Sequence, residues 1–190
     1  MSGEIWSFIE TDEGKLHDTA AKMASEARRN SKLFKKGIPC GVFFGPSTSI
    51  SLLEELQAYG IKKIYFVESE DHLSGDTLAE NFCSLVAKRS PELILFAATP
   101  LGAELGARVA ASLRKGLISN CVDFEFIQGK FGARKPMYEG KSYGYYTWCN
   151  EAPFVATVCL TSLEAIEADK KIEPEVVHKN GKHIRPESAW

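Results

Sequence analysis

The stretch from Glu92 to Phe124 constrains the fold of this chain more than any other. The apolar run at residues 93–98 has the length of a strand and lacks polar alternation, which is typical of a strand buried on both faces. Thr99 and Pro100 follow it directly, and these residue types favour the cap and the first position of a helix. We therefore predict a helix that starts at the carboxyl end of a buried strand.

Two rows of side chains recur at helical spacing in this predicted helix. A row of larger apolar residues lies beside a row of small ones: Leu101, Leu105, Val109 and Leu113, then Gly102, Gly106 and Ala110. A small-residue row allows a helix to lie very close to a sheet. Gly116 suits the left-handed residue after the helix, and a second apolar segment starts at Leu117. The stretch is thus a strand-helix-strand unit, which predicts a parallel sheet.

Three similar units precede this one. The strand candidates at residues 4–9, 40–44 and 64–67 are each followed by a segment with helical periodicity. In the second unit, Ser51 and Glu54 form a capping-box pattern, and Gly60 ends the predicted helix. This alternation predicts a doubly wound α/β sheet with helices on both faces.

The pattern changes after Gly116. Residues 118–127, 130–137, 142–148 and 154–160 are apolar or aromatic segments separated by turns, without intervening helices. We expect them to be strands added antiparallel to the parallel sheet at its C-terminal end. Residues 163–190 mix charges with prolines and show little periodicity, so we expect an extended tail or linker after a domain of residues 1–162.

Composition excludes several classes of protein. The 190 residues are 44% hydrophobic and 25% charged, with a net charge of −2, which is too small for a nucleic-acid surface. No apolar run approaches the roughly 20 residues of a membrane span, so we expect no membrane insertion and a cytoplasmic or mitochondrial-matrix location. The five cysteines are odd in number and contain no C-x-x-C pair, so we expect reduced, mostly buried thiols.

The candidate binding site is the start of the predicted helix at Thr99. Open α/β sheets bind ligands at the carboxyl ends of their strands, and backbone N–H groups at a helix start can receive an anion. We therefore assign Thr99 and Gly102 to a candidate nucleotide or anion site. The alternative is that Thr99 is only a cap and Gly102 only a close-packing residue, since neither role needs a ligand.

Other motifs give no catalytic or metal site. The loop at residues 45–49 lacks the lysine of a P-loop, no G-x-G-x-x-G follows the first strand, and no G-x-S-x-G is present. The histidines lack metal-ligand spacing: His17, His72, His178 and His183. An acidic loop is interpreted as a solvated turn, formed by Glu68, Glu70 and Asp71. A basic helix end is interpreted as solvent-facing, with docking to an acidic partner as the alternative: Arg28, Arg29, Lys32, Lys35 and Lys36.

Several segments, in order, resemble the N-terminal domain of the electron-transfer flavoprotein alpha subunit. The similar segments are IWSFIE, a following helix with EARR, YGIKKIYFVES, AATPLGAELGARVAASLRKGLISNCVDF, RKPMYEGKSYG and PFVATV. They cover about residues 4 to 165, and several ordered segments are much more specific than any one of them. The resemblance implies a three-layer, mostly parallel sheet of the adenine nucleotide alpha hydrolase-like kind.

The resemblance also implies a role in electron transfer from a dehydrogenase through FAD. The family's alpha subunit adds a C-terminal FAD-binding domain and docks on a beta subunit that carries AMP. We therefore expect this chain to be a scaffold in a heterodimer, an electron-carrier subunit rather than an enzyme with its own turnover. FAD would belong to the complete complex and not to this chain alone, and AMP to the beta-like partner. The chain departs from the family pattern at Ala103, Ala107, Glu139 and Cys159, which puts the contacts around the flavin in doubt.

Two alternatives compete with this interpretation. A stand-alone adenine-nucleotide-binding module of universal-stress-protein type would bind a nucleotide near Thr11, Asp12, Thr99 and Gly102, but the G-x-x-G phosphate loop of that family is absent. A structural subunit that associates with itself, as a homodimer, is the other alternative.

Overall fold

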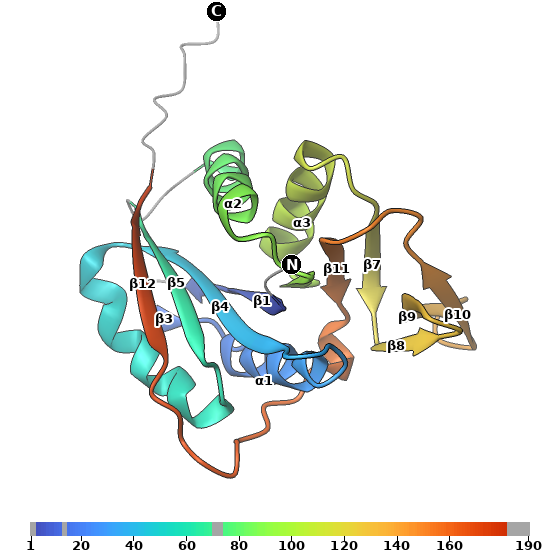
Figure 1. The fold of residues 1–190 in the computed structure, drawn as a ribbon, viewed down its shortest axis with the longest axis horizontal. Coiled ribbons are helices and arrows are strands. Elements are labelled where there is room, and N and C mark those ends of the chain that lie inside the picture. The colour runs from blue at the N-terminus through green and yellow to red at the C-terminus, as the bar shows by residue number, and fades with distance from the viewer. Residues whose placement is uncertain (1–2, 13–14, 70–73, 182–190) are drawn as a thin grey trace, which may run out of the picture.

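Seven parallel strands form the central sheet, in the order β12-β5-β4-β1-β6-β11-β7 (Figure 1). This computed structural model describes residues 3–12, 15–69 and 74–181. The strands of this sheet are β1 (Glu4–Ile9), β4 (Ile38–Gly45), β5 (Lys63–Glu68), β6 (Leu93–Ala97), β7 (Leu117–Cys121), β11 (Phe154–Val158) and β12 (Glu175–Asn180). A small hairpin precedes the first helix, with strands β2 (Thr11–Asp12) and β3 (Lys15–Leu16).

Helices cover both faces of the sheet, as the alternating pattern predicts (Figure 1). The covering elements are α1 (Ala20–Ser31), the 3₁₀ helix η1 (Ser47–Tyr59), α2 (Gly75–Arg89) and α3 (Pro100–Ser112), with a short 3₁₀ turn η2 (Leu160–Ser162) near the end of the chain. One core packs α1 and η1 against the sheet through residues such as Met23 and Leu56, and the other packs α2 and α3 through Phe82 and Val109. The three-layer, doubly wound α/β class is confirmed.

The direction in which strands are added reverses beside β1. The chain runs from β1 outward to β4 and β5, and then returns to place β6 on the other side of β1. The carboxyl ends of β1 and β6 therefore lie side by side at the topological switch point, where open α/β sheets form a ligand crevice.

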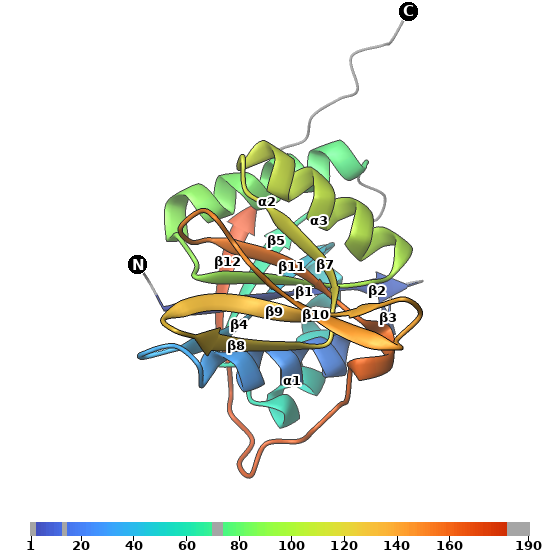
Figure 2. The ribbon, with the colours of Figure 1, turned by 90° about the vertical axis from the view of Figure 1, so that its right-hand side faces the viewer.

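A second, smaller sheet lies against the end of the main one (Figure 2). It contains β8 (Asp123–Ile127), β9 (Lys130–Met137) and β10 (Ser142–Thr147), all antiparallel in the order β10-β9-β8. Phe131 joins it to the rest of the protein through ring contacts at 5.0 Å to both Phe34 and Phe154, and it stacks on Trp148 at 5.6 Å.

The antiparallel prediction is right for β8, β9 and β10, although they form a sheet of their own, and it is wrong for residues 118–121, which lie in β7, and for residues 154–160. Strand β11 lies parallel between β6 and β7, so the main sheet stays parallel to its end. The segment that forms the small sheet connects β7 to β11, and it supplies the long crossover that two parallel strands need. Local sequence does not reveal this, because a buried strand has the same pattern in either orientation.

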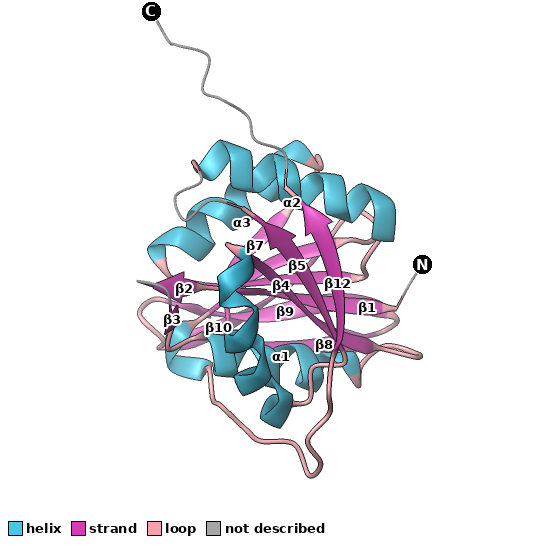
Figure 3. Cartoon of the chain, turned by 90° about the vertical axis from the view of Figure 1, so that its left-hand side faces the viewer, coloured by secondary structure: helices cyan, strands magenta, loops and turns pink. Residues whose placement is uncertain are grey.

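Part of the expected tail belongs to the main sheet. Glu175–Asn180 forms β12, which pairs in parallel with β5 at the sheet edge (Figure 3). From Val176 onward its side chains alternate between exposed and half-buried, a pattern that is typical of an edge strand and too weak to stand out among charges. The boundary proposed at residue 162 stays a prediction.

Two local predictions are wrong. The 3₁₀ helix η1 starts at Ser47, directly after the extended Pro46, so Ser51 lies inside it and not at a cap. The left-handed residue that ends helix α3 is Arg114, whose φ is 53°, and not Gly116. With Arg114 in this conformation, the N–H of Lys115 donates to the carbonyl of Ala110 and closes the helix end. Gly60, with φ at 79°, ends η1 as predicted.

Candidate functional site

The start of helix α3 lies at the switch point, directly off the end of β6. Thr99 is its N-cap, and the hydroxyl oxygen accepts the backbone N–H of Gly102 at 2.9 Å. Pro100 occupies the first helical position. The sequence therefore placed both residues of the candidate site at this helix start, and the structure brings them together.

The side-chain carboxylate of Glu10 lies next to the N-terminal end of this helix. Glu10 follows β1 directly, and its side-chain oxygens lie 2.8 and 2.9 Å from the hydroxyl of Thr99, which donates to them. Glu10 is only 4% exposed. A negative group suits this place, because the N-terminal end of a helix carries a partial positive charge. Glu10 was not among the site residues predicted from the sequence, although a charged residue directly after a buried strand was a usable signal.

Gly102 allows this approach. A methyl group there would overlap the carbonyl oxygen of Ala97, and it would lie 2.9 Å from a carboxylate oxygen of Glu10 and 3.1 Å from the hydroxyl of Thr99. The small-residue row continues this close contact at Gly106, where a methyl group would lie 3.1 Å from the ring of Phe96. Glycine at position 102 is thus required by the packing of helix, strand and carboxylate.

The loop after β1 turns back toward Glu10. The backbone N–H of His17 donates to the carbonyl oxygen of Glu10 at 3.0 Å, and the N–H of Thr19 donates to Nδ1 of His17 at 3.2 Å. Burial raises the pKa of Glu10, while the hydrogen bond from Thr99 and the charge of His17 oppose this rise. Thr11 and Asp12, expected near a nucleotide, form β2 in the hairpin with β3. Nucleotide or anion binding at Thr99 and Gly102 stays a prediction.

The raised pKa predicts how stability depends on pH. The folded protein binds a proton at Glu10 more tightly than the unfolded chain, whose value is near 4.5, so this site's contribution to stability falls as pH rises from 4.5 through the folded pKa. We expect Glu10→Gln to gain stability relative to the wild type over this window, by about 1.4 kcal/mol per unit of pKa difference. Urea unfolding of both proteins across the window measures it, and a constant or opposite difference would contradict it.

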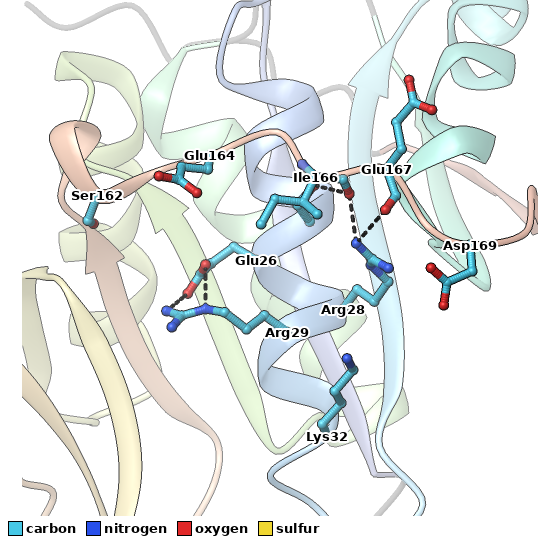
Figure 4. A pocket seen from close by; sticks show the side chains of 10 residues that line it. Glu26, Arg28, Arg29, Lys32, Ser162, Glu164, Ile166, Glu167 and Asp169 are labelled. Atoms are coloured by element: carbon cyan, nitrogen blue, oxygen red, sulfur yellow. Dashed lines mark hydrogen bonds and ion pairs between the residues drawn. The ribbon is translucent and has the colours of Figure 1, made fainter.

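A polar groove lies on the other face of the sheet, between α1 and the segment after η2 (Figure 4). Its volume is about 450 Å³. Arg28 donates to the carbonyl oxygens of Ile166 at 2.7 Å and Glu167 at 3.2 Å, and the hydroxyl of Ser25 accepts the N–H of Ile166 at 2.9 Å. The carboxylate of Glu26 forms an ion pair with the guanidinium of Arg29 at 2.6 Å. The bonds of Ser25 and Arg28 anchor the segment that leads to β12, a role of Arg28 that neither sequence interpretation predicted. The other four basic residues of this helix end are exposed, as the solvent-facing interpretation predicts: Arg29, Lys32, Lys35 and Lys36.

The remaining residues singled out from the sequence are dispersed. Ser47 donates to the carboxylate of Glu68, and His178 packs its ring 5.5 Å from that of Phe66. Glu70, Asp71, His72 and His183 lie outside the described residues. Within the described ranges, no three His, Cys, Asp or Glu side chains are grouped so that they could hold a metal ion, and no helix is both long and apolar enough for a membrane span.

The cysteines are unpaired thiols. Cys40 and Cys121 are buried, Cys83 and Cys159 are half-buried, and Cys149 is exposed. Burial raises the pKa of Cys121 to about 12 and raises that of Cys40 further. A high pKa keeps a thiol protonated and unreactive, which agrees with a packing role for these two residues.

Exposed aromatic side chains gather on the small sheet. Five of the ten large apolar side chains that are exposed in the described part of the chain lie on β8, β10 or the turn after β9; we call them the aromatic rim: Phe126, Ile127, Tyr138, Tyr143 and Tyr146. Tyr138 is 77% and Tyr143 is 59% exposed. Among the described strands β10 pairs only with β9, so its outer edge is open. Open edges and exposed aromatic residues are typical of interaction surfaces.

Comparison with known proteins agrees with this architecture. A family model described as the electron transfer flavoprotein domain matches residues 5–180. The chain belongs to this family. The match includes β12, and it extends beyond the segments on which the resemblance rested.

Similar proteins carry related names. The chain is 27% identical to the electron transfer flavoprotein subunit alpha of Clostridium acetobutylicum, over 95% of this chain and 56% of that protein. It is 27% identical to the protein FixB of Clostridium saccharobutylicum, over 87% of this chain and 50% of that protein. It is 33% identical to the acryloyl-CoA reductase electron transfer subunit beta of Anaerotignum propionicum, over 67% of this chain and 35% of that protein. The chain thus spans about half the length of the first two relatives.

The four departures from the family pattern lie at accessible positions. Ala103, Ala107 and Glu139 are exposed, and Cys159 is half-buried. Glu139 adopts a φ of 57°, a backbone conformation that favours glycine. Changes at such positions leave the core intact and alter only the accessible surface.

Proposed function

We propose that this chain acts as the N-terminal domain of an electron-transfer-flavoprotein alpha-like subunit. Its role is to scaffold electron transfer from a dehydrogenase through FAD: it docks on a beta-like subunit and helps to hold a FAD-binding domain. It is an electron-carrier component of the cytoplasm or mitochondrial matrix, without turnover of its own. The observation that carries the proposal is the family match over residues 5–180.

The aromatic rim supports the docking step. Tyrosine and phenylalanine contribute much of the binding energy in protein interfaces, because they bury a large area with few rotatable bonds. Arg134 lies over the ring of Tyr143 at 5.5 Å, and the hydroxyl of Tyr146 donates to the sulfur of Met137 at 3.3 Å. These contacts hold two of the rings on β10 in place. A pre-ordered surface loses less entropy on binding, which favours it as the docking face for the beta-like subunit.

Substitutions on the rim test this docking. We expect the double variant Tyr138→Ser with Tyr143→Ser to bind the beta-like subunit of the same organism at least about ten-fold more weakly than the wild type, since each such ring is worth about 1 kcal/mol or more. Isothermal titration calorimetry measures the change. The matched control is Ile166→Ser with Val176→Ser, which removes exposed apolar side chains away from the small sheet and should bind normally. Equal weakening by both double variants, or none by the first, would show that the rim is not the docking face.

The cofactor part of the proposal has its own test. FAD belongs to the complete complex, and AMP to the beta-like partner, so the isolated chain should retain neither after dialysis. Stoichiometric retention of a flavin, with its yellow absorbance, by the isolated chain would refute the scaffold role.

A further inference from the structure

The crevice at the switch point is formed by other elements than those that carry the aromatic rim. In this fold the crevice is the expected place for a ligand anion, between the carboxyl ends of β1 and β6 and at the start of α3. The groups that would receive such an anion are the backbone N–H groups of the first helical turn and the hydroxyl of Thr99.

Most of these donors are already used. Pro100 has no N–H, the N–H of Gly102 donates to the hydroxyl of Thr99, and the N–H of Ala103 donates to the carbonyl of Thr99 at 2.9 Å. The hydroxyl of Thr99 in turn donates to the carboxylate of Glu10. An incoming phosphate would therefore have to displace Glu10 to reach the hydroxyl of Thr99.

Glu10 also supplies the charge that the helix start favours. Its carboxylate lies beside Gly102, where a methyl group would come within 2.9 Å of one carboxylate oxygen, and it is almost fully buried. A phosphate bound at Gly102 would therefore lie close to the carboxylate of Glu10. Two anions in such a buried site repel each other strongly, because little water is present to screen them. We propose that Glu10 is the resident anion of this crevice and that it closes the domain to nucleotide phosphates.

Removal of Glu10 tests the proposal. We expect Glu10→Ala to bind inorganic phosphate at least about ten-fold more tightly than the wild type, since the variant loses the repelling charge and frees the hydroxyl of Thr99. Thermal unfolding in rising phosphate, against chloride at equal ionic strength, measures the effect. Formate, a carboxylate that fits the space left by the side chain, should also stabilise the variant and not the wild type.

Glu4 provides a matched control. It is equally buried, lies at the opposite end of β1, and accepts a hydrogen bond from Tyr65 at 2.8 Å. Glu4→Ala should lose stability but should gain nothing from phosphate or formate beyond the effect of chloride. If both variants respond equally, or if the folded Glu10→Ala variant responds to neither anion, the proposal is wrong.

A measurement on the wild type keeps the test independent of how the variants fold. We expect the carboxyl carbon resonance of Glu10 to stay unchanged when inorganic phosphate or AMP is titrated into the labelled wild-type chain. A saturable shift of that resonance would mean that the crevice accepts a phosphate with Glu10 present, and would overturn the proposal. Neither result bears on docking to a beta-like subunit, which the aromatic-rim variants test separately.

Discussion

Phe131→Ala is expected to lower the free energy of unfolding by about 3 to 5 kcal/mol, the range for removing a buried phenylalanine side chain. Phe131 is 4% exposed and lies at the centre of an aromatic cluster. Its ring contacts five others: Phe34, Phe124, Phe126, Trp148 and Phe154. These partners come from the turn after α1, the small sheet, the loop after β10 and β11, so one substitution weakens the attachment of the small sheet to the main one.

Denaturant unfolding, followed by circular dichroism, measures this loss. Hydrogen exchange should also show faster exchange of the β8–β10 amides, while β1 and β4 stay protected. Phe126→Ala is the matched control, because this ring contacts Phe34 and Phe131 but is half exposed. The control should lose about 1 kcal/mol. Equal losses in the two variants would mean that Phe131 does not join the two sheets.

Gly102→Ala is expected to destabilise the protein by about 3 kcal/mol, at the upper end of the range for overpacking. In an ordinary helix position the same change would stabilise by about 1 kcal/mol, because alanine is the better helix former. Here the added methyl group meets the carbonyl of Ala97, which belongs to the sheet and cannot rotate away, and the carboxylate of Glu10. The sign of the effect therefore reports the close contact between α3 and β6.

Thermal or urea unfolding decides the sign. Gly116→Ala is the control, because the nearest atom to a methyl group there is a ring carbon of Trp148 at 3.7 Å, an ordinary contact. That variant should stay within about 0.5 kcal/mol of the wild type. A Gly102→Ala protein as stable as the wild type would show that α3 can move away from the sheet without loss.

The sequence predicted those parts of the fold that depend on local pattern. The apolar run before Thr99, the capping residue types and the small-residue row together predicted a strand, a helix start and a close helix-to-sheet contact, and all three are present. Leu101 is the exception in the larger row, since it is exposed at the first turn. The order of similar segments also indicated the family, which the match over residues 5–180 confirms.

The candidate site was only half predictable. Thr99 and Gly102 could be located because a cap and a close-packing glycine have local signatures. Glu10 could not be paired with them, because it lies 89 residues away in sequence from Thr99. A contact of this kind follows from strand order, and the order β4-β1-β6 places the ends of β1 and β6 side by side.

By itself, the sequence determined the α/β class, the alternation of strands and helices in the first part of the chain, and the helix start at Thr99. These depend on periodicity and on residue types within a few positions of one another. Only the tertiary structure decided that β11 lies parallel between β6 and β7, that β12 extends the sheet, and that the carboxylate of Glu10 lies on the start of α3. These depend on pairings between distant segments, whose energies come from shared burial and hydrogen bonds that no single segment displays.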